Sequence, residues 1–345
     1  MREKHYVAST KARLEDRISE LLKEVLPRAC AALGPSASTM RALVTVVSLF
    51  LLGVQAHWTY SGEGLTEDQW SKEYPACGGR KQSPIDLVKH EMKFNQSLKR
   101  LNLVGYGEEG LQFSMTNNGH TVQITLPHTM HMTDSKGSLY RSQQLHFHWG
   151  GGPSGISGSE HTVDGIRRVM EIHFVHFNDK YGSFEEAQSQ PDGLAVMAVF
   201  VEIDEYNENT YYSAFISELF NITHPGQTTT LKDTTIQKML PRDTRNYYTY
   251  EGSLTTPPCT ENVKWFVFRD SVKLSKKQVE RIENAIKNDH NKTLHDGYRK
   301  TQPLNHRVVE TNFPFSDKSG PSYLYLKKID QKLENWAHFI GPHYV

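Results

Sequence analysis

The sequence has few cysteines, no excess of either charge and no hydrophobic run long enough to span a membrane. Its 345 residues contain three cysteines, too few for the four-cysteine sites that often hold structural zinc. Lysine plus arginine and aspartate plus glutamate balance at 39 each, so no global field attracts nucleic acid or an anionic membrane. The main apolar run, Ala42 to Val54, is shorter than the roughly 20 residues that cross a bilayer. We therefore expect neither a nucleic-acid partner nor a stable membrane anchor.

This apolar run has the features of a secretory signal peptide. Arg41 precedes it, and Val54-Gln55-Ala56 ends in a small residue that a signal peptidase accepts. The pattern predicts a signal peptide at residues 40–56 and a secreted, extracellular product, although a buried core segment would share its composition. Residues 1–39 precede the predicted start, and we expect them to be an upstream extension that is absent from the mature protein.

Cysteine and asparagine positions agree with secretion. Removal of everything before His57 discards Cys30 and leaves Cys77 and Cys259, an even pair of the kind that secreted proteins tend to oxidise. Asn95, Asn221 and Asn291 each begin an Asn-x-Ser/Thr triplet. Behind a signal peptide these triplets become candidate glycosylation sites.

Short alternating or apolar runs, separated by glycine, asparagine and proline, dominate residues 57–313. Helical periodicity is limited to Ser183–Gln188 and to Ser275–Asn288, where Ser275 can cap the first turn. These patterns predict one mixed, β-dominated domain. The predicted strands are Gln112–Met115, Thr121–Leu126, Gln143–Trp149, Val169–Phe177, Leu194–Ile203 and Val263–Phe268.

The sequence pattern changes in residues 314–345. A linker, Pro314 to Ser322, precedes an apolar stripe at helical spacing, which predicts an amphipathic helix. We expect this helix to dock on an apolar surface of its own chain or of a partner, and self-association through it is one option. The stripe comprises Leu326, Ile329, Leu333, Trp336 and Ile340.

Two histidines one residue apart, His146 and His148, lie in the predicted strand QLHFHW. Side chains alternate between the faces of a strand, so both imidazoles would share one face with Gln144. Two neutral imidazoles on a rigid strand form half of a metal site. The alternative is a half-buried strand with two hydrogen-bonded histidines.

The segment MEIHFVHFN supplies a third candidate ligand, His173. Glu171 lies two residues earlier on the same face, where its carboxylate can accept from the imidazole and fix its tautomer. Two strands can bring His146, His148 and His173 together. Three neutral nitrogens leave tetrahedral zinc one open position for water, which is typical of a catalytic site.

Together with further motifs, these segments resemble the α-class carbonic anhydrases, and the secreted members most closely. The resemblance runs from about His57 to Phe313 and covers motifs in family order. It implies a large, twisted, mostly antiparallel central sheet with short peripheral helices. The motifs are QSPID (82–86), NNGH (117–120), QLHFHWG (144–150), GSEHTVDG (158–165), EIHFVHFN (171–178), YEGSLTTPPC (250–259) and QPLNHR (302–307), with Trp58 and Tyr60 before them.

The resemblance implies reversible hydration of CO₂ to bicarbonate and a proton, with roles in pH regulation. His146, His148 and His173 would hold Zn²⁺, whose activated water attacks CO₂. Thr255 would accept a hydrogen bond from this nucleophile and donate one to Glu160, and Thr256 would contact the substrate. An apolar wall would hold CO₂, formed by Val175, Val196, Leu254 and Trp265.

The resemblance also assigns supporting roles. His120 would carry the released proton, helped by water ordered on Tyr60 and Asn118. Gln144, Glu171 and the backbone carbonyl of Asn305 would accept from His146, His173 and His148, respectively. Cys77 and Cys259 match the pair that is bridged in secreted relatives. His161, beside Glu160, is expected to be a buried structural histidine.

Two other functions are compatible with the sequence. The first is a non-catalytic binding module of the same fold, which would have lost one or more zinc histidines, although all three are present here. The second is a secreted interaction protein whose function resides in residues 314–345.

Overall fold

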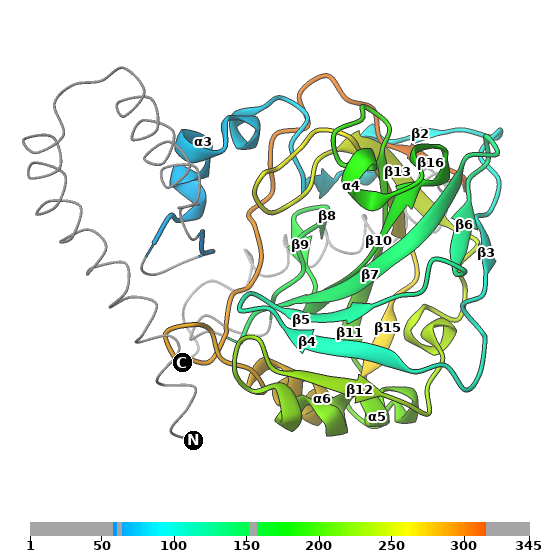
Figure 1. The fold of residues 1–345 in the computed structure, drawn as a ribbon. Coiled ribbons are helices and arrows are strands. Elements are labelled where there is room, and N and C mark those ends of the chain that lie inside the picture. The colour runs from blue at the N-terminus through cyan, green and yellow to red at the C-terminus, as the bar shows by residue number, and fades with distance from the viewer. Residues whose placement is uncertain (1–57, 61–63, 152–156, 315–345) are drawn as a thin grey trace, which may run out of the picture. The chain divides into compact units, whose positions relative to one another are not determined.

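The computed structural model describes residues 58–60, 64–151 and 157–314, which form a strand-dominated domain around one large mixed sheet (Figure 1). Parallel pairing joins β11 (Leu194–Ile203) to β14 (Val263–Phe268) and to β15 (Val272–Leu274), and β16 (Glu310–Thr311) to β2 (Lys93–Phe94). The other neighbours in this sheet are antiparallel. The predicted fold class is therefore confirmed. In order across the sheet, the strands are β12 (Thr228–Leu231), β4 (Phe113–Asn117), β5 (Val122–Thr125), β7 (Leu139–Trp149), β10 (Met170–Asn178), β11 (Leu194–Ile203), β14 (Val263–Phe268), β13 (Tyr247–Gly252), β16 (Glu310–Thr311) and β2 (Lys93–Phe94).

Shorter strands extend this framework. β15 (Val272–Leu274) pairs with β11, and β6 (His131–Thr133) lies between β7 and β3 (Asn102–Val104). A separate small sheet contains β1 (Asp86–Leu87), β8 (Thr162–Val163) and β9 (Ile166–Arg167). All the predicted strands are present. Leu194–Ile203 and Val263–Phe268 keep their predicted ends, three others shift by one or two residues, and β7 begins four residues earlier than predicted.

The α-helices of the described residues are short: α3 (Trp70–Glu73), α4 (Phe184–Ala187), α5 (Ser213–Glu218) and α6 (Lys276–Glu283). Helix α6 begins with a capping box, since the Ser275 hydroxyl accepts from Gln278 N and the Gln278 side chain accepts from Ser275 N. The prediction that this helix continues to Asn288 is wrong. The Asn284 side chain bonds Glu280 O as the helix ends, and Lys287 pairs with Thr293 in a β-bridge.

Strand β10 is buried along its whole length and separates two apolar layers. Ile172 and Phe174 face a large cluster that includes residues of α5 and α6, whereas Val175 faces a second cluster. Glu171 and His173 share the face of Val175, and they are 0% and 1% exposed. A buried carboxylate and imidazole are costly unless they are paired, so this face must supply hydrogen-bond partners.

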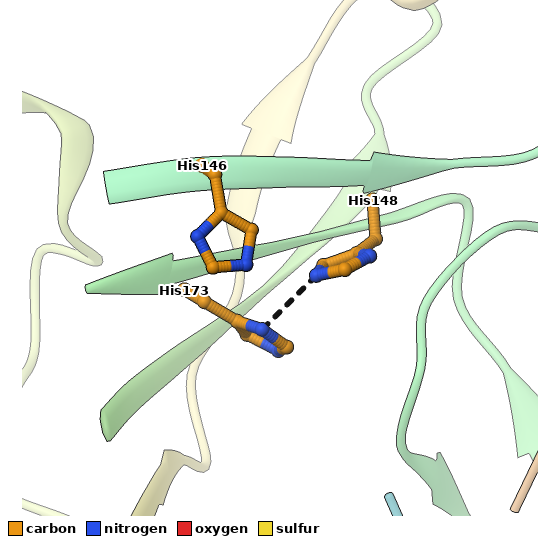
Figure 2. A group of neighbouring side chains, drawn as sticks. All are labelled: His146, His148 and His173. Atoms are coloured by element: carbon orange, nitrogen blue, oxygen red, sulfur yellow. Dashed lines mark hydrogen bonds between the residues drawn. The ribbon is translucent and has the colours of Figure 1, made fainter. Parts of the chain in front are cut away.

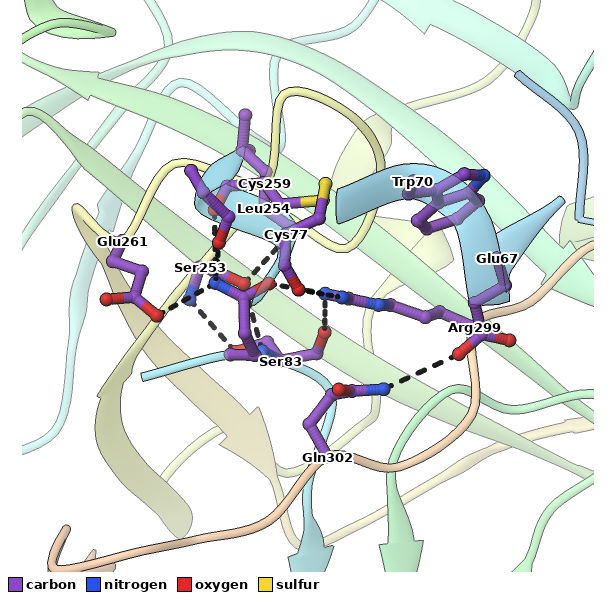
Figure 3. The surroundings of a disulfide bond; sticks show 12 residues. Glu67, Trp70, Cys77, Ser83, Ser253, Leu254, Cys259, Glu261, Arg299 and Gln302 are labelled. Atoms are coloured by element: carbon purple, nitrogen blue, oxygen red, sulfur yellow. Dashed lines mark hydrogen bonds between the residues drawn. A yellow bond between two sulfur atoms is a disulfide. The ribbon is translucent and has the colours of Figure 1, made fainter. Parts of the chain in front are cut away.

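Cys77 and Cys259 form a disulfide across a sequence separation of 182 residues (Figure 3), which confirms the predicted pair. The predicted extension (1–39), signal peptide (40–56) and amphipathic helix within 314–345 lie outside the described residues. Within the described ranges, no helix has the length and apolar character needed to cross a membrane.

We predict that Glu283, near the end of α6, makes stability depend on pH. The side chain is 5% exposed, and burial, followed by the charges of Glu280 and Asp296, raises its pKa to about 7. Because the folded-state pKa lies above the unfolded value, the stabilisation that exists below about pH 4.5 is lost as the pH rises through 7. The free energy of unfolding of Glu283→Gln should therefore exceed that of the parent by up to about 3 kcal/mol at pH 8 and by almost nothing at pH 4.5.

Urea unfolding of the zinc-free proteins at pH 4.5, 6, 7 and 8 measures this difference. Glu185→Gln, an exposed glutamate of helix α4 that does not contribute to the Glu283 shift, is the control and should change little with pH. A parent–variant difference that stays flat from pH 4.5 to 8 would contradict the assignment.

Candidate metal centre

The register between β7 and β10 brings three histidines together. His146 lies directly opposite His173, and His148 lies opposite Glu171 on the same face. The three imidazoles point toward one another from the two strands (Figure 2). One nitrogen of each ring lies within 4.8 Å of the other two, so the group could hold a metal ion.

The outward nitrogen of each ring contacts one acceptor. His146 Nδ1 lies 2.9 Å from Gln144 Oε1, and His173 Nε2 lies 2.7 Å from Glu171 Oε1, as the strand pattern predicts. His148 Nδ1 lies 2.9 Å from the carbonyl of Gly297. These acceptors fix the tautomers and leave the lone pair of each inward nitrogen free for a metal.

The predicted partner of His148, the Asn305 carbonyl, is wrong. Gly297 O takes this place, and the Asn305 side chain instead donates to Arg80 O at 2.7 Å. Segment 294–297 runs beside the end of β7, where Gly297 N donates to Trp149 O. A backbone acceptor depends on where the chain passes and has no side-chain signature, so the sequence could not identify it.

The distance between His148 Nε2 and His173 Nδ1 is 3.1 Å (Figure 2). With the outward nitrogens donating, both inward nitrogens carry lone pairs, and two lone pairs at this distance repel unless a cation lies between them. Nitrogens bound to one tetrahedral zinc ion are about 3.3 Å apart. The donor set and its spacing therefore fit Zn²⁺.

Burial favours the neutral form of His146 and His148. Desolvation, followed by repulsion from His148 and His173, holds the pKa of His146 well below its usual value. Desolvation also lowers the pKa of His148. Metal binding requires neutral imidazole. At neutral pH, few protons therefore have to leave these two rings before a metal can bind.

Glu160 lies directly behind the histidines and is 0% exposed. Its Oε1 accepts from Arg299 N at 2.8 Å, and its Oε2 has no hydrogen-bond partner. The predicted hydrogen bond from Thr255 to Glu160 is therefore not formed. Because a buried carboxylate oxygen without a partner is costly, Oε2 is an acceptor for a polar hydrogen that enters the centre.

Apolar residues form a wall next to the histidines. Val175, Val196 and Trp265 belong to one buried cluster, and Leu254 packs against it. The Trp265 ring centroid lies 4.9 Å from that of His173. Thr255, in the adjacent loop, is 5% exposed, and the carbonyl of Thr256 accepts from Cys259 N. The four residues predicted to form the wall therefore share one apolar cluster that contacts His173 through Trp265.

Ring contacts run from His120 through Trp58 and Tyr60 to His148, so two of the residues predicted to carry the proton adjoin the histidine cluster. The Tyr60 ring meets that of His148 edge to face at 6.4 Å. The imidazole of His120 stacks on Trp58 at a centroid distance of 3.9 Å. Asn118 Oδ1 accepts from the backbone N–H groups of His120 and Thr121, so this side chain shapes the turn that carries His120.

Glu171 has a second histidine partner. Its Oε1 lies 2.6 Å from His161 Nδ1, its Oε2 accepts from His161 N, and His161 Nε2 lies 2.7 Å from the Tyr250 hydroxyl. Burial raises the pKa of Glu171, but the charge and hydrogen bonds of His161 outweigh this effect, so the net pKa is low. His161 is thus a buried structural histidine that keeps the His173 acceptor ionised.

Three imidazoles with fixed tautomers, two of them buried, an unpaired carboxylate oxygen and an adjoining apolar cluster define a candidate catalytic metal centre. The sequence profile of eukaryotic-type carbonic anhydrases matches residues 65–313. The chain belongs to this family, as its motifs indicated.

Similar proteins cover most of the chain. Carbonic anhydrase 6 of Mus musculus is 59% identical over 298 residues, which are 85% of this chain and 94% of the relative. Carbonic anhydrase 6 of Homo sapiens is 59% identical over 301 residues, covering 86% and 98%. Carbonic anhydrase 12 of Homo sapiens is 40% identical over 263 residues, covering 74% and 73%.

We predict that Gln144→Ala weakens zinc binding about 10- to 100-fold, because His146 loses the acceptor that fixes its tautomer. Competition with a chromogenic chelator measures the dissociation constant. Gln143→Ala is the matched control: it is the adjacent residue of β7, and its side chain contacts His128 instead of a ligand. Equal zinc affinity in the two variants would show that Gln144 has no role at the metal.

Proposed function

We propose that this chain is a secreted, zinc-dependent enzyme that hydrates CO₂ reversibly to bicarbonate and a proton. Membership of the carbonic anhydrase family establishes the enzyme class. The observation that carries the zinc assignment is the set of three inward nitrogens, each ring fixed by its own acceptor. The substrate is a small molecule.

When bound, zinc would lower the pKa of water enough for it to lose a proton near neutral pH and provide hydroxide as the nucleophile, a general property of carbonic anhydrases. His146, His148 and His173 would hold the ion. Glu160 Oε2, buried and without a partner, would accept a hydrogen bond and so orient the attacking oxygen. Thr255 would accept from the same nucleophile, and Thr256 would contact bicarbonate.

The apolar wall suits the other reactant. CO₂ has no net dipole, so it gains nothing from displacing water at polar groups and prefers a dry surface. Val175, Val196, Leu254 and Trp265, which share one apolar cluster in contact with His173, would supply such a surface. The wall would place CO₂ carbon within reach of the oxygen that Glu160 and Thr255 orient.

Proton release would follow a separate route. We assign His120 as the shuttle, because histidine is the side chain whose unperturbed pKa lies closest to neutral pH. The Tyr60 hydroxyl and the Asn118 side-chain amide would order the water between the metal and His120. Burial, followed by the charge of Glu160, raises the Tyr60 pKa, so this hydroxyl stays protonated and orders water without losing its proton.

Secretion is proposed from the predicted signal peptide and is supported by the disulfide, which suits an oxidising compartment. Asn221 and Asn291 are exposed and are the better glycan acceptors. Asn95 is half-buried. Its amide nitrogen donates to Glu310 Oε1, as that of Asn221 does to Glu218 Oε2, so a glycan at either position would first have to break this contact.

Stopped-flow measurement of CO₂ hydration, with zinc content measured on each sample, tests the function. The parent should hydrate CO₂ rapidly with one zinc per chain, and His146→Ala should lose both zinc and activity down to the background rate. His128→Ala, which removes an imidazole outside the centre, should keep both. A zinc-loaded parent that does not hydrate CO₂ would favour the binding-module alternative.

For the proton route, we predict that His120→Ala lowers kcat by about 10-fold or more and leaves kcat/KM nearly unchanged, because proton release follows the chemical step. Added imidazole buffer should restore much of the lost kcat. If kcat and kcat/KM fall together, or imidazole has no effect, His120 is not the shuttle.

A further inference from the structure

Arg299 is a buried cation whose hydrogen bonds all go to neutral groups. The side chain is 3% exposed, and the guanidinium lies 5.5 Å from the Trp70 ring centroid. Nη1 donates to Gln82 Oε1 at 2.8 Å and to Ser83 O at 2.9 Å, and Nη2 donates to Cys77 O at 3.1 Å. Nε has no hydrogen-bond partner. Burial of a charge without a bonded carboxylate is costly, so retention of an arginine here calls for a specific role.

The backbone of the same residue reaches the metal centre. Arg299 N donates to Glu160 Oε1 at 2.8 Å, and Glu160 lies 3.5 Å from His148 Nδ1 and 3.9 Å from His173 Nδ1. Two residues earlier, Gly297 O contacts His148 Nδ1. The backbone of segment 297–299 therefore orients both a metal ligand and the carboxylate behind it.

The groups that bind the guanidinium also fix the loop of Thr255 (Figure 3). Gln82 Nε2 donates to Ala76 O and, more weakly, to Cys259 O, and the disulfide joins Cys259 to Cys77. At the other end of this loop, Ser83 N donates to Ser253 Oγ at 2.9 Å. We refer to Cys77, Gln82, Ser83, Cys259 and Arg299 as the Arg299 junction.

We propose that Arg299 is a positioning residue, and that its side chain, fixed in the Arg299 junction, sets the position of Glu160 relative to Thr255. This inference rests on the proposed function, since these two residues are assigned there to orient the nucleophile. Arg299 touches no reacting atom and acts through its own backbone N–H. The disulfide belongs to the same unit, because it fixes the carbonyl that Nη2 binds and the end of the Thr255 loop.

The experiment compares Arg299→Met and Arg299→Lys with Arg307→Met. Arg307 is a matched control, because its guanidinium also bonds three carbonyls and lies 5.5 Å from an aromatic ring, that of Tyr250, but its backbone does not contact Glu160. Three quantities are measured on the full chain: hydration kcat/KM per bound zinc, melting temperature, and hydrogen exchange of a peptide spanning residues 297–301 in the zinc-free protein.

Arg299→Met should lower kcat/KM about 100-fold, because small misplacements of orienting groups have effects of this size. It should also raise the rate of amide hydrogen exchange in the peptide spanning residues 297–301 at least about tenfold. Arg299→Lys should be intermediate in both readouts. Arg307→Met should keep kcat/KM within about twofold, whatever its melting temperature. If both methionine variants lose activity in proportion to stability, Arg299 is only structural and the proposal fails.

A cycle with the paired substitutions Cys77→Ser and Cys259→Ser tests the unit. If the Arg299 junction acts as a unit, Arg299→Met should lower kcat/KM by a much smaller factor in the disulfide-free protein than in the parent. An equal factor in the two backgrounds would contradict this. Hydrogen exchange remains informative if the parent does not hydrate CO₂. In that case the proposed function fails, whereas unchanged protection of residue 299 in Arg299→Met would overturn the positioning role by itself.

Discussion

The antiparallel register between β7 and β10 is the constraint on which the rest of the centre depends. It places His146 opposite His173, and His148 and Glu171 opposite each other, so one ladder of backbone hydrogen bonds sets three ligands and one acceptor. A slip of one residue would turn every one of these side chains to the opposite face. The apolar side chains of β10 oppose such a slip, because Ile172 and Phe174 would then leave the large cluster.

Polar groups in the interior are tolerated here because each one is an acceptor or donor for the next. From His173 the chain of contacts passes through Glu171 and His161 to the Tyr250 hydroxyl, which donates to Ser83 Oγ at 2.9 Å. Such a network rigidifies a core when every member is satisfied. Beside the histidine cluster, Glu160 Oε2 is an exception, and an unsatisfied buried oxygen next to three nitrogens that could hold a metal is where a reactive group is expected to bind.

Much of the fold and the ligand set could be predicted from the sequence because both depend on local periodicity. The His-x-His and Glu-x-His spacings fix a shared face once the segments are strands, and the structure keeps that geometry in His146, His148 and His173. Contacts made by the backbone could not be predicted in this way. The acceptor of His148 is a glycine carbonyl, and the donor to Glu160 is the main chain of Arg299. Helix α6 ended earlier than Ile286 indicated, because a local cap and a β-bridge outweighed the apolar spacing.

The acceptor of His148 lies 149 residues beyond it in the sequence. All three ligating histidines have been synthesised by residue 173, but the group that fixes the tautomer of His148 belongs to one of the last segments of the domain. A polypeptide truncated before Gly297 would carry every ligand and still lack a fully preorganised site. Full preorganisation of the three histidines therefore requires the late segment around Gly297 to fold back onto β7.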